Sequence, residues 1–314
     1  MQAGIHWYPG HIAKYERQLL DLLKLVDVVV EVRDARMPLA TTNPRLIAKI
    51  GAKPTLIILN KSDIADPVQS GRWQKSFTQE NHRAMLYAAR NAQGKTKVID
   101  AILQMGEATL QKLEARGRKR RPLRVLVAGM PNVGKSTLIN SIVGRKKVQT
   151  GHRAGVTTST RWVRIHPDIE LMDSPGIIPP QLDDQTAASL LAIVNSIGEA
   201  AFDDEEAACF LLERIEMLYP GRLAEAFKLP PEKQHQTEPF SLGCIADVRR
   251  YYLPGGLPDY LRAAQALLSD FRQARLGRLT LEHFPARPST AQEKEKPESQ
   301  ADRQNDDDSE ESPL

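Results

Sequence analysis

The sequence predicts an α/β protein built on a doubly wound, mostly parallel β-sheet, with a smaller helical C-terminal domain and a disordered acidic tail. Four short β-branched and aliphatic runs predict buried strands at residues 26–32, 55–59, 125–128 and 169–172. The run 125–128 leads into a Gly-rich turn, and the other three are ended by polar residues. Apolar residues at helical spacing lie between these runs, as the crossover connections of parallel strands require. Beyond about residue 182, helical patterns dominate.

Three helical stretches follow the predicted sheet, at residues 187–197, 205–218 and 257–275. The last of them places its apolar side chains on one face: Leu261, Ala264, Leu268 and Phe271. The Pro179-Pro180 pair disfavours a helix and indicates a linker. We therefore predict three parts, at residues 1–180, 181–284 and 285–314.

The composition is that of a soluble globular protein, because 41% of the 314 residues are hydrophobic and 26% are charged. No run approaches the roughly 18 to 20 consecutive apolar residues of a membrane span, and the N-terminal segment carries charges where a signal peptide is apolar. Cys209 and Cys244 lack the spacing of a zinc site or a disulfide framework. We expect a cytoplasmic, monomeric protein that does not bind a membrane.

The net charge of +4 hides an asymmetry between the body of the chain and its end. Nine acidic and three basic residues lie between Pro288 and Leu314, so this segment carries −6 and the rest of the chain +10. The segment has no aromatic residue and too little apolar surface to fold, which predicts disorder. The basic remainder favours a polyanionic partner such as RNA, although charge alone fits a merely solubilising surface equally well.

A phosphate-binding loop is predicted at residues 129–136, where Gly-Met-Pro-Asn-Val-Gly-Lys-Ser satisfies G-x-x-x-x-G-K-[ST] between a predicted strand and a predicted helix. The backbone N–H groups, the helix N-terminus and Lys135 are expected to surround phosphates, and the Ser136 hydroxyl to ligate magnesium. The residues expected to contact the nucleotide here are Pro131, Asn132, Val133, Gly134, Lys135, Ser136 and Thr137.

A base-reading element is predicted at Asn60-Lys61-Ser62-Asp63, which follows the run at 55–59 and matches N-K-x-D. The Asp63 carboxylate can accept hydrogen bonds from N1–H and from the exocyclic amine of guanine, whereas adenine has no amine there and presents an acceptor at N1. Alone, this tetrapeptide is common in turns. Beside a phosphate-binding loop it predicts GTP and GDP as ligands, with Asn60, Lys61 and Asp63 in contact.

Two further elements follow the phosphate-binding loop. Asp173-Ser174-Pro175-Gly176 ends the fourth apolar run and matches D-x-x-G, in which Asp173 holds magnesium through water and the Gly176 N–H meets the γ-phosphate. Thr157, which lies in a polar stretch between the two elements, is the candidate for a second magnesium contact.

A fourth element, Tyr87-Ala88-Ala89-Arg90, occupies the place of the loop whose backbone reads guanine O6. Ala88 stands where serine is usual in this loop. Ala88 and Ala89 are therefore predicted nucleotide contacts.

The order of these elements is permuted, because N-K-x-D at residue 60 and the Ala-Ala loop at residue 88 precede the phosphate-binding loop at 129 and D-x-x-G at 173. Ordinary GTPases run the other way. From residue 5 to residue 284, the chain resembles the circularly permuted P-loop GTPases of the bacterial ribosome biogenesis GTPase A type. The resemblance is also carried by Trp-Tyr-Pro-Gly-His-Ile-Ala-Lys at 7–14, Asp-Ala-Arg at 34–36, the stretch 151–158, Gly-Gly-Leu-Pro-Asp at 255–259, Arg-Ala-Ala at 262–264 and Asp-Phe-Arg at 270–272.

The resemblance implies a GTPase domain at residues 1–180 and a helical RNA-binding domain at 181–284. It implies magnesium-dependent hydrolysis of GTP to GDP and phosphate. It further implies binding to ribosomal RNA and a role in assembly of the large ribosomal subunit. Ala154 departs from the pattern, since proline is frequent there in such proteins.

Orientation of the attacking water needs a separate explanation, because Ile177 stands where Ras-like enzymes use a glutamine. The resemblance implicates the histidine of the P-G-H element, His11, although a lone histidine there would more often cap or pack the first helix. Asn132 stands where potassium-activated GTPases carry an asparagine ligand, so potassium is a second candidate, while Asn132 could equally shape the turn. The predicted catalytic residues are His11, Lys135, Thr157 and Gly176.

Three classes of function fit these observations. The first is a GTPase of ribosome assembly, the second is a GTPase switch acting on a protein or transfer RNA, and the third is an RNA-binding scaffold without catalysis. The third class is disfavoured by the intact set of predicted phosphate and magnesium contacts: Lys135, Ser136, Thr157, Asp173 and Gly176.

The first prediction concerns the base. Asp63→Asn should weaken GTP binding by about 10- to 100-fold, the effect of losing a charge-assisted hydrogen bond, and should strengthen binding of xanthosine nucleotides, because an amide can donate to the carbonyl that replaces the guanine amine. Titration with both nucleotides measures the exchange of preference. Equal affinity of the wild-type protein for ATP and GTP would contradict the base assignment.

Overall fold

The computed structural model describes residues 19–79, 82–144, 161–173, 185–197, 202–229 and 240–285, and the fold is reported for these ranges. All the strands and helices below belong to one compact unit, which ends at Phe284. The predicted boundary at 180/181 and the acidic tail lie outside the described residues.

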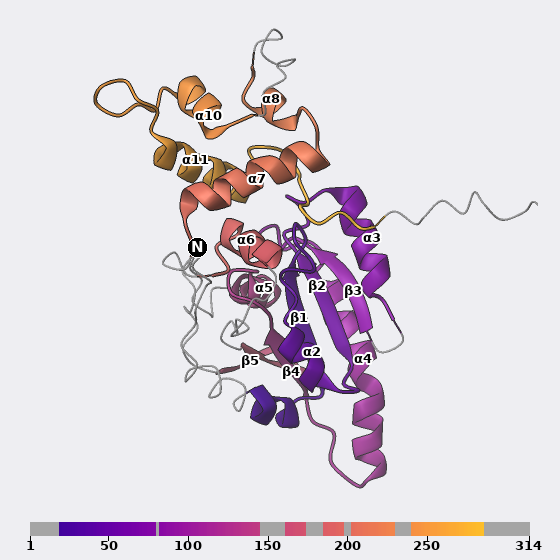
Figure 1. The fold of residues 1–314 in the computed structure, drawn as a ribbon. Helices are drawn as coiled ribbons and strands as arrows, with labels where there is room; N and C mark the ends of the chain where they lie inside the picture. The colour runs from indigo at the N-terminus through magenta and orange to yellow at the C-terminus, as the bar shows by residue number, and fades with distance from the viewer. Residues whose placement is uncertain are drawn as a thin grey trace, which may run out of the picture. The chain divides into compact units, whose positions relative to one another are not determined.

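The described strands form one six-stranded sheet in the order β3-β2-β1-β4-β6-β5 (Figure 1). The strands are β1 (Val28–Asp34), β2 (Thr55–Asn60), β3 (His82–Tyr87), β4 (Leu123–Ala128), β5 (Arg161–His166) and β6 (Ile169–Asp173). Every neighbouring pair is parallel except β5 and β6. Strands β1 and β4 are adjacent although far apart in sequence, which creates the crevice where an open α/β sheet binds its ligands.

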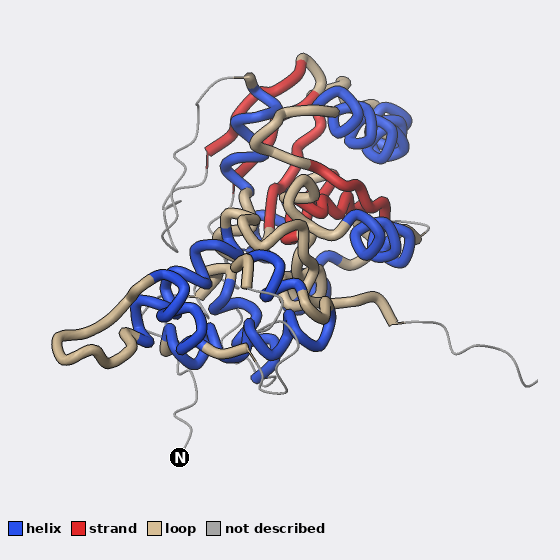
Figure 2. The backbone as a smooth tube through the Cα atoms, turned by 90° about the horizontal axis from the view of Figure 1, so that it is seen from above, coloured by secondary structure: helices blue, strands red, loops and turns tan. Residues whose placement is uncertain are grey.

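Helices cover both faces of the sheet, as a doubly wound fold requires (Figure 2). One face packs against α4 (Lys95–Ala115) and α5 (Lys135–Val143), and the other against α2 (Pro44–Ile50), α3 (Pro67–Phe77) and the helical residues 19–25. Successive residues of β1 point to opposite faces, so Val28 and Val30 belong to one hydrophobic cluster and Val29 to the other. This burial on both faces explains the continuous apolar runs in the sequence.

The C-terminal half of the described chain is helical, as predicted. It comprises α6 (Gln185–Ile193), α7 (Asp204–Leu218), α8 (Arg222–Ala226), α10 (Leu242–Arg249) and α11 (Tyr260–Arg272). Helix α11 packs against both α7 and α10, and the apolar faces of these helices continue the cluster that covers α4 and α5. Among the described residues, none of the helices is long and apolar enough to cross a membrane.

Helix α11 begins later than the pattern predicted. Asp259 caps it by accepting a hydrogen bond from the backbone N–H of Arg262, so the residues 257–259 precede the helix. The buried face holds Ala264, Leu268 and Phe271, but Leu261 lies in the first turn with 49% exposure. The prediction that Leu261 shares the apolar face is therefore wrong.

The strand predictions are confirmed to within two residues at each end for β1, β2, β4 and β6. Strands β3 and β5 were not predicted, because both lie at sheet edges and their sequences, His-Arg-Ala-Met-Leu-Tyr and Arg-Trp-Val-Arg-Ile-His, mix polar with apolar residues.

The fold yields a prediction about Gly129, which leads from β4 into the predicted phosphate-binding loop. Its φ is +148°, and a Cβ at this position would lie 2.3 Å from the carbonyl oxygen of Val32 in β1. Gly129→Ala should therefore lower the free energy of unfolding by roughly 2–4 kcal/mol, from backbone strain and overpacking together. Urea denaturation measures the loss.

Gly117→Ala is the matched control. Its φ of +72° imposes backbone strain, but a Cβ there would meet nothing within 4 Å, so the expected loss is only about 1–2 kcal/mol. Equal losses in the two variants would show that the close approach to β1 contributes nothing.

Candidate functional site

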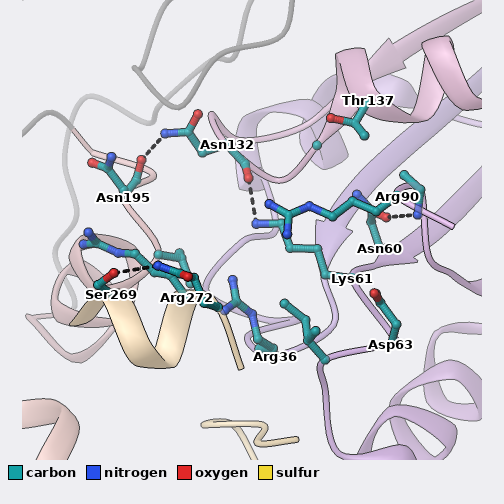
Figure 3. A pocket seen from close by; sticks show the side chains of 15 residues that line it. Arg36, Asn60, Lys61, Asp63, Arg90, Asn132, Thr137, Asn195, Ser269 and Arg272 are labelled. Atoms are coloured by element: carbon teal, nitrogen blue, oxygen red, sulfur yellow. Dashed lines mark hydrogen bonds between the residues drawn. The ribbon is translucent and has the colours of Figure 1, made fainter. Parts of the chain in front are cut away.

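A cavity of about 730 Å³ lies at the carboxyl edge of the sheet, where the sequence placed its nucleotide elements (Figure 3). The loops that follow β1, β2, β3 and β4 line one part of it. The turn after α6 and the C-terminal end of α11 line another. Polar side chains from most of these segments line it: Arg36, Lys61, Asp63, Asn132, Asn195 and Arg272.

The predicted phosphate-binding loop joins β4 to α5, and α5 begins at Lys135 as the pattern requires. Gly134 has φ +98°, and a Cβ there would lie 2.3 Å from the Asn60 side-chain nitrogen, so only glycine fits. Lys135 is 6% exposed, and its ammonium donates to the carbonyl oxygens of Gly129 and Met130 at 3.2 and 2.9 Å. A buried positive charge and a helix N-terminus thus coincide at this loop, which is the chemistry of a phosphate site.

Asn60 ties three nucleotide elements together. It ends β2 with its side chain buried, and its amide nitrogen donates to the carbonyl of Val133 at 2.8 Å. Its side-chain oxygen accepts from the N–H of Ala89 at 3.1 Å. The Ala89 amide therefore holds the Ala88-Ala89 loop against β2, and Ala89 also lines the cavity.

Lys61 connects the base-reading element to the phosphate-binding loop. Its ammonium donates to the carbonyl oxygen of Asn132 and to the Asp34 carboxylate, both at 2.8 Å. Burial lowers the pKa of Lys61, and the charge of Arg36 lowers it further, against the raising effect of Asp34. Asp63 lies two residues beyond Lys61 and lines the same cavity.

Asp34 is the buried anion of this network. It ends β1 with no exposure, and it accepts bidentate hydrogen bonds from the Arg36 guanidinium at 3.0 and 2.8 Å as well as the bond from Lys61. Burial alone would raise its pKa, but the charges of Arg36 and Lys61 outweigh burial and hold the pKa of Asp34 far below its ordinary value of 3.8. Its stabilising contribution is therefore complete above that ordinary value and is lost as the pH falls toward the lowered one.

Asn132 occupies a left-handed backbone conformation in the phosphate-binding loop, with φ +57°. Its side-chain nitrogen donates to the carbonyl of Asn195, and the Ser196 hydroxyl donates to the carbonyl of Pro131 at 2.7 Å. The turn after α6 is thus bonded to the phosphate-binding loop, and Figure 3 shows the bond between Asn132 and Asn195.

Several predicted residues cannot be placed in this way. His11, Thr157 and Gly176 lie outside the described residues. Asp173 ends β6 in register with Val127 of β4, so its backbone lies next to the strand that feeds the phosphate-binding loop. The roles assigned to these four residues remain predictions.

The arrangement as a whole can bind a purine nucleotide diphosphate or triphosphate. The N-terminus of α5 and the Lys135 ammonium meet at this loop, and both favour the predicted phosphate ligand. Asp63 and Ala89 line the same cavity as Gly134, and the base is predicted to bind beside them. This is the geometry of a GTPase site assembled from elements in permuted order.

Comparison with known proteins agrees with this geometry. A sequence profile for the family described as 50S ribosome-binding GTPase matches residues 124–217. The protein named ribosome biogenesis GTPase A from Bacillus cereus is 36% identical over 278 residues, which cover 88% of this chain and 93% of that protein. The protein of the same name from Thermotoga maritima is 32% identical over 276 residues, with coverage of 88% and 93%.

The chain belongs to the ribosome biogenesis GTPase A family. It is a GTPase of ribosome biogenesis, and the prediction of a circularly permuted P-loop GTPase is confirmed. A solved structure described as GDP-bound YlqF has a TM-score of 0.60 and 27% identity, covering 85% of this chain and 99% of that one. The GNP-bound YlqF structure from T. maritima gives 0.59 and 26%, with coverage of 86% and 98%.

Four residues at the site of this GTPase were given no role by sequence reasoning: Asp34, Arg36, Asn195 and Arg272. The Asp-Ala-Arg signal was visible, since polar residues directly after a buried strand fall at the ligand edge of a parallel sheet. Asn195 and Arg272 carried no such signal, because helices α6 and α11 reach the cavity only through tertiary packing.

The site yields a prediction about Asp34. Asp34→Asn should lower the free energy of unfolding by about 3–5 kcal/mol, because it leaves the cations of Arg36 and Lys61 beside a neutral group in a buried position. It should also weaken GDP binding, since Lys61 loses the anion that holds it against Asn132. Denaturation with and without GDP measures both effects.

Asp21→Asn is the matched control. The Asp21 side chain is 66% exposed and pairs only with the exposed Lys24 in the described structure, so its loss should stay within about 0.5 kcal/mol. An Asp34 variant as stable as this control would show that the buried cluster does not support the fold.

Proposed function

We propose that this GTPase acts in assembly of the large ribosomal subunit, where its helical part binds ribosomal RNA in the GTP state and hydrolysis leads to release. The carrying observation is that one cavity is lined both by the nucleotide elements and by α11. A ligand in that cavity would contact both parts of the molecule. The γ-phosphate of GTP could therefore change the position of the helical part and, with it, the surface that a partner binds.

Sequence and surface chemistry support an RNA partner. Residues 1–287 carry +10, which favours a polyanion. Tyr252, between α10 and α11, and Tyr260, the first residue of α11, are 47% and 48% exposed, and the exposed Arg250 and Arg262 flank them in sequence. Aromatic rings that stack on bases beside arginines that pair with phosphates are typical of RNA-binding surfaces. The relatives' family description, 50S ribosome-binding GTPase, favours the large subunit.

Within the site, Asp63 reads guanine, Asn60 and Lys61 fix the loops around the base, and Lys135 compensates the phosphate charge. Magnesium fits the donor set, because Ser136 lies in the first turn of α5 and Asp173 ends the strand next to β4. Hydroxyl and carboxylate oxygens are the ligands this ion prefers. Ser136, Asp173 and Thr157 would hold it, and it would supply positive charge to the phosphates.

Hydrolysis also needs an oriented water, which Ile177 cannot provide. His11 is the proposed replacement, and a potassium ion at Asn132 is the second candidate. Because His11 is distant in sequence from all nucleotide elements, binding of the ribosomal partner is the natural event to position it. The free protein, which we take to be a cytoplasmic monomer, is then a slow GTPase.

The test is co-sedimentation with large ribosomal subunits, together with single-turnover hydrolysis of GTP in their presence and absence. The wild-type protein should sediment with subunits in a nonhydrolysable GTP analogue, less so in GDP, and subunits should accelerate hydrolysis. Lys135→Ala is the negative control for turnover. Equal sedimentation with subunits in the GTP analogue and in GDP would overturn the proposal, and so would binding to a protein or a transfer RNA instead of the subunit.

The same assay isolates His11. His11→Ala should lower the stimulated rate by roughly 10²- to 10⁴-fold if the imidazole transfers a proton, and by less if it only orients water, while GTP affinity stays unchanged. Potassium and sodium buffers are compared in parallel. Equal stimulated rates for variant and wild type would remove His11 and leave potassium at Asn132 or a ribosomal group in its place.

A further inference from the structure

The segment after α11 returns to the nucleotide-binding part of the molecule and packs against its loops. We call residues 278–284 the C-terminal strap. Its apolar side chains are buried, since Leu279 and Leu281 are 1% and 0% exposed, and Thr280 is fully buried between them. The strap is therefore part of the core of this unit.

The strap bonds first to the loop that follows β1. The N–H of Leu281 donates to the carbonyl of Arg36 at 2.8 Å. The Glu282 carboxylate accepts from the N–H groups of Leu39 and Ala40 at 2.6 and 2.9 Å. The C-terminal strap thus fixes the loop that carries the Asp34–Arg36 ion pair.

The strap bonds next to α3 and its N-terminus. The N–H of Asp66 donates to the Thr280 hydroxyl at 3.1 Å, and the Trp73 indole nitrogen donates to the carbonyl of Glu282 at 2.7 Å. Asp66 is also the N-cap of α3, where its side chain accepts from two backbone N–H groups. The C-terminal end of the base-reading loop is therefore fixed by the strap.

Arg278, the first residue of the strap, donates hydrogen bonds to the loop that carries Asp63. Its Nε donates to the carbonyl of Ala65 and its terminal nitrogen to the carbonyl of Ser62, both at 3.0 Å. These two carbonyls bracket Asp63 in sequence. A planar guanidinium has its donors in a fixed fork, so it sets the spacing of two acceptors in a way that a flexible ammonium cannot.

We propose that Arg278 is a positioning residue for guanine recognition, which holds the loop 62–65 so that the Asp63 carboxylate meets the base. The proposal rests on the role proposed above for Asp63. It implies that the selectivity of the site depends on a residue more than 200 positions away in the chain. Without this clamp, the carbonyls of Ser62 and Ala65 turn to water and the loop samples other conformations.

Inosine diphosphate is the probe, because inosine lacks the exocyclic amine that Asp63 is proposed to accept from. The ratio of GDP to IDP affinity therefore reports the alignment of Asp63 with the base. Arg278→Gln should weaken GDP binding about tenfold, the effect of one misaligned charge-assisted hydrogen bond, and should weaken IDP binding much less. The ratio should fall toward the value of Asp63→Asn.

Two further variants make the test specific. Arg278→Lys keeps the charge and can reach one carbonyl but not both, so it should restore only part of the wild-type ratio of GDP to IDP affinity. It also replaces Arg278→Gln in the test if that variant folds poorly. Arg222→Gln is the matched control, because Arg222 makes an exposed ion pair with Glu225 and should leave the ratio unchanged. Thermal denaturation confirms that each variant is folded at the assay temperature.

Hydrogen exchange gives a second readout. The N–H of Ser62 donates to the carbonyl of Tyr87, and the N–H of Ile64 to that of Lys61. Both amides should exchange faster in Arg278→Gln, while amides of β2 keep their protection.

The outcomes separate the two proposals. A wild-type protein that binds GDP and IDP equally would refute Asp63 as the reader of the amine, whatever Arg278 does. A wild-type preference that Asp63→Asn abolishes and Arg278→Gln retains would overturn the positioning role. A smaller ratio together with faster exchange at Ser62 and Ile64 would support it.

Discussion

The buried carboxylate of Asp34 is the group on which the rest of the site depends. It has no exposure, yet it stays charged because a bidentate arginine and a lysine surround it. Each of these two side chains also bonds to another part of the molecule. Lys61 bonds to the phosphate-binding loop, and Arg36 donates to the carbonyl of Phe271 and lies over its ring at the end of α11. One anion thus couples the base-reading loop, the phosphate-binding loop and the helical part.

Burying a cluster of charges costs much desolvation energy, and the loss of one of its members destabilises the fold. Removing one partner leaves an uncompensated buried charge, whereas the complete set satisfies its hydrogen bonds. The cluster therefore favours a single arrangement of the three segments. Precise spacing between the two ends of a nucleotide pocket is what selective binding of a base and its phosphates requires.

The permuted order explains why C-terminal residues reach this site. Because D-x-x-G is the last nucleotide element of the chain, everything after it starts at the ligand edge of the sheet. The turn after α6 can then bond to Asn132, α11 can line the cavity, and the strap can grip the loop that carries Asp63. If GTP and GDP favour different positions of the helical part, a partner that binds one of these positions must also change the affinity for the nucleotide, because coupling between two binding sites is reciprocal.

The sequence alone determined the class of fold, the permuted order and most of the ligand-edge residues. Strands buried on both faces are continuous apolar runs, and the nucleotide elements have local signatures whose spacing follows from the contacts they make to phosphate and base. Asn60, Lys61, Asp63 and Lys135 could be named for this reason. Short edge strands such as β3 could not, because their residues need not be apolar.

Only the tertiary structure decided which residues hold those elements in place. The Asp34 cluster joins β1 to β2, β4 and α11, and Arg278 reaches Ser62 across 216 positions. A side chain that bonds to backbone carbonyls leaves no pattern in the partner's sequence, since every residue has a carbonyl. Long-range clamps of this kind become visible only when packing brings the segments together.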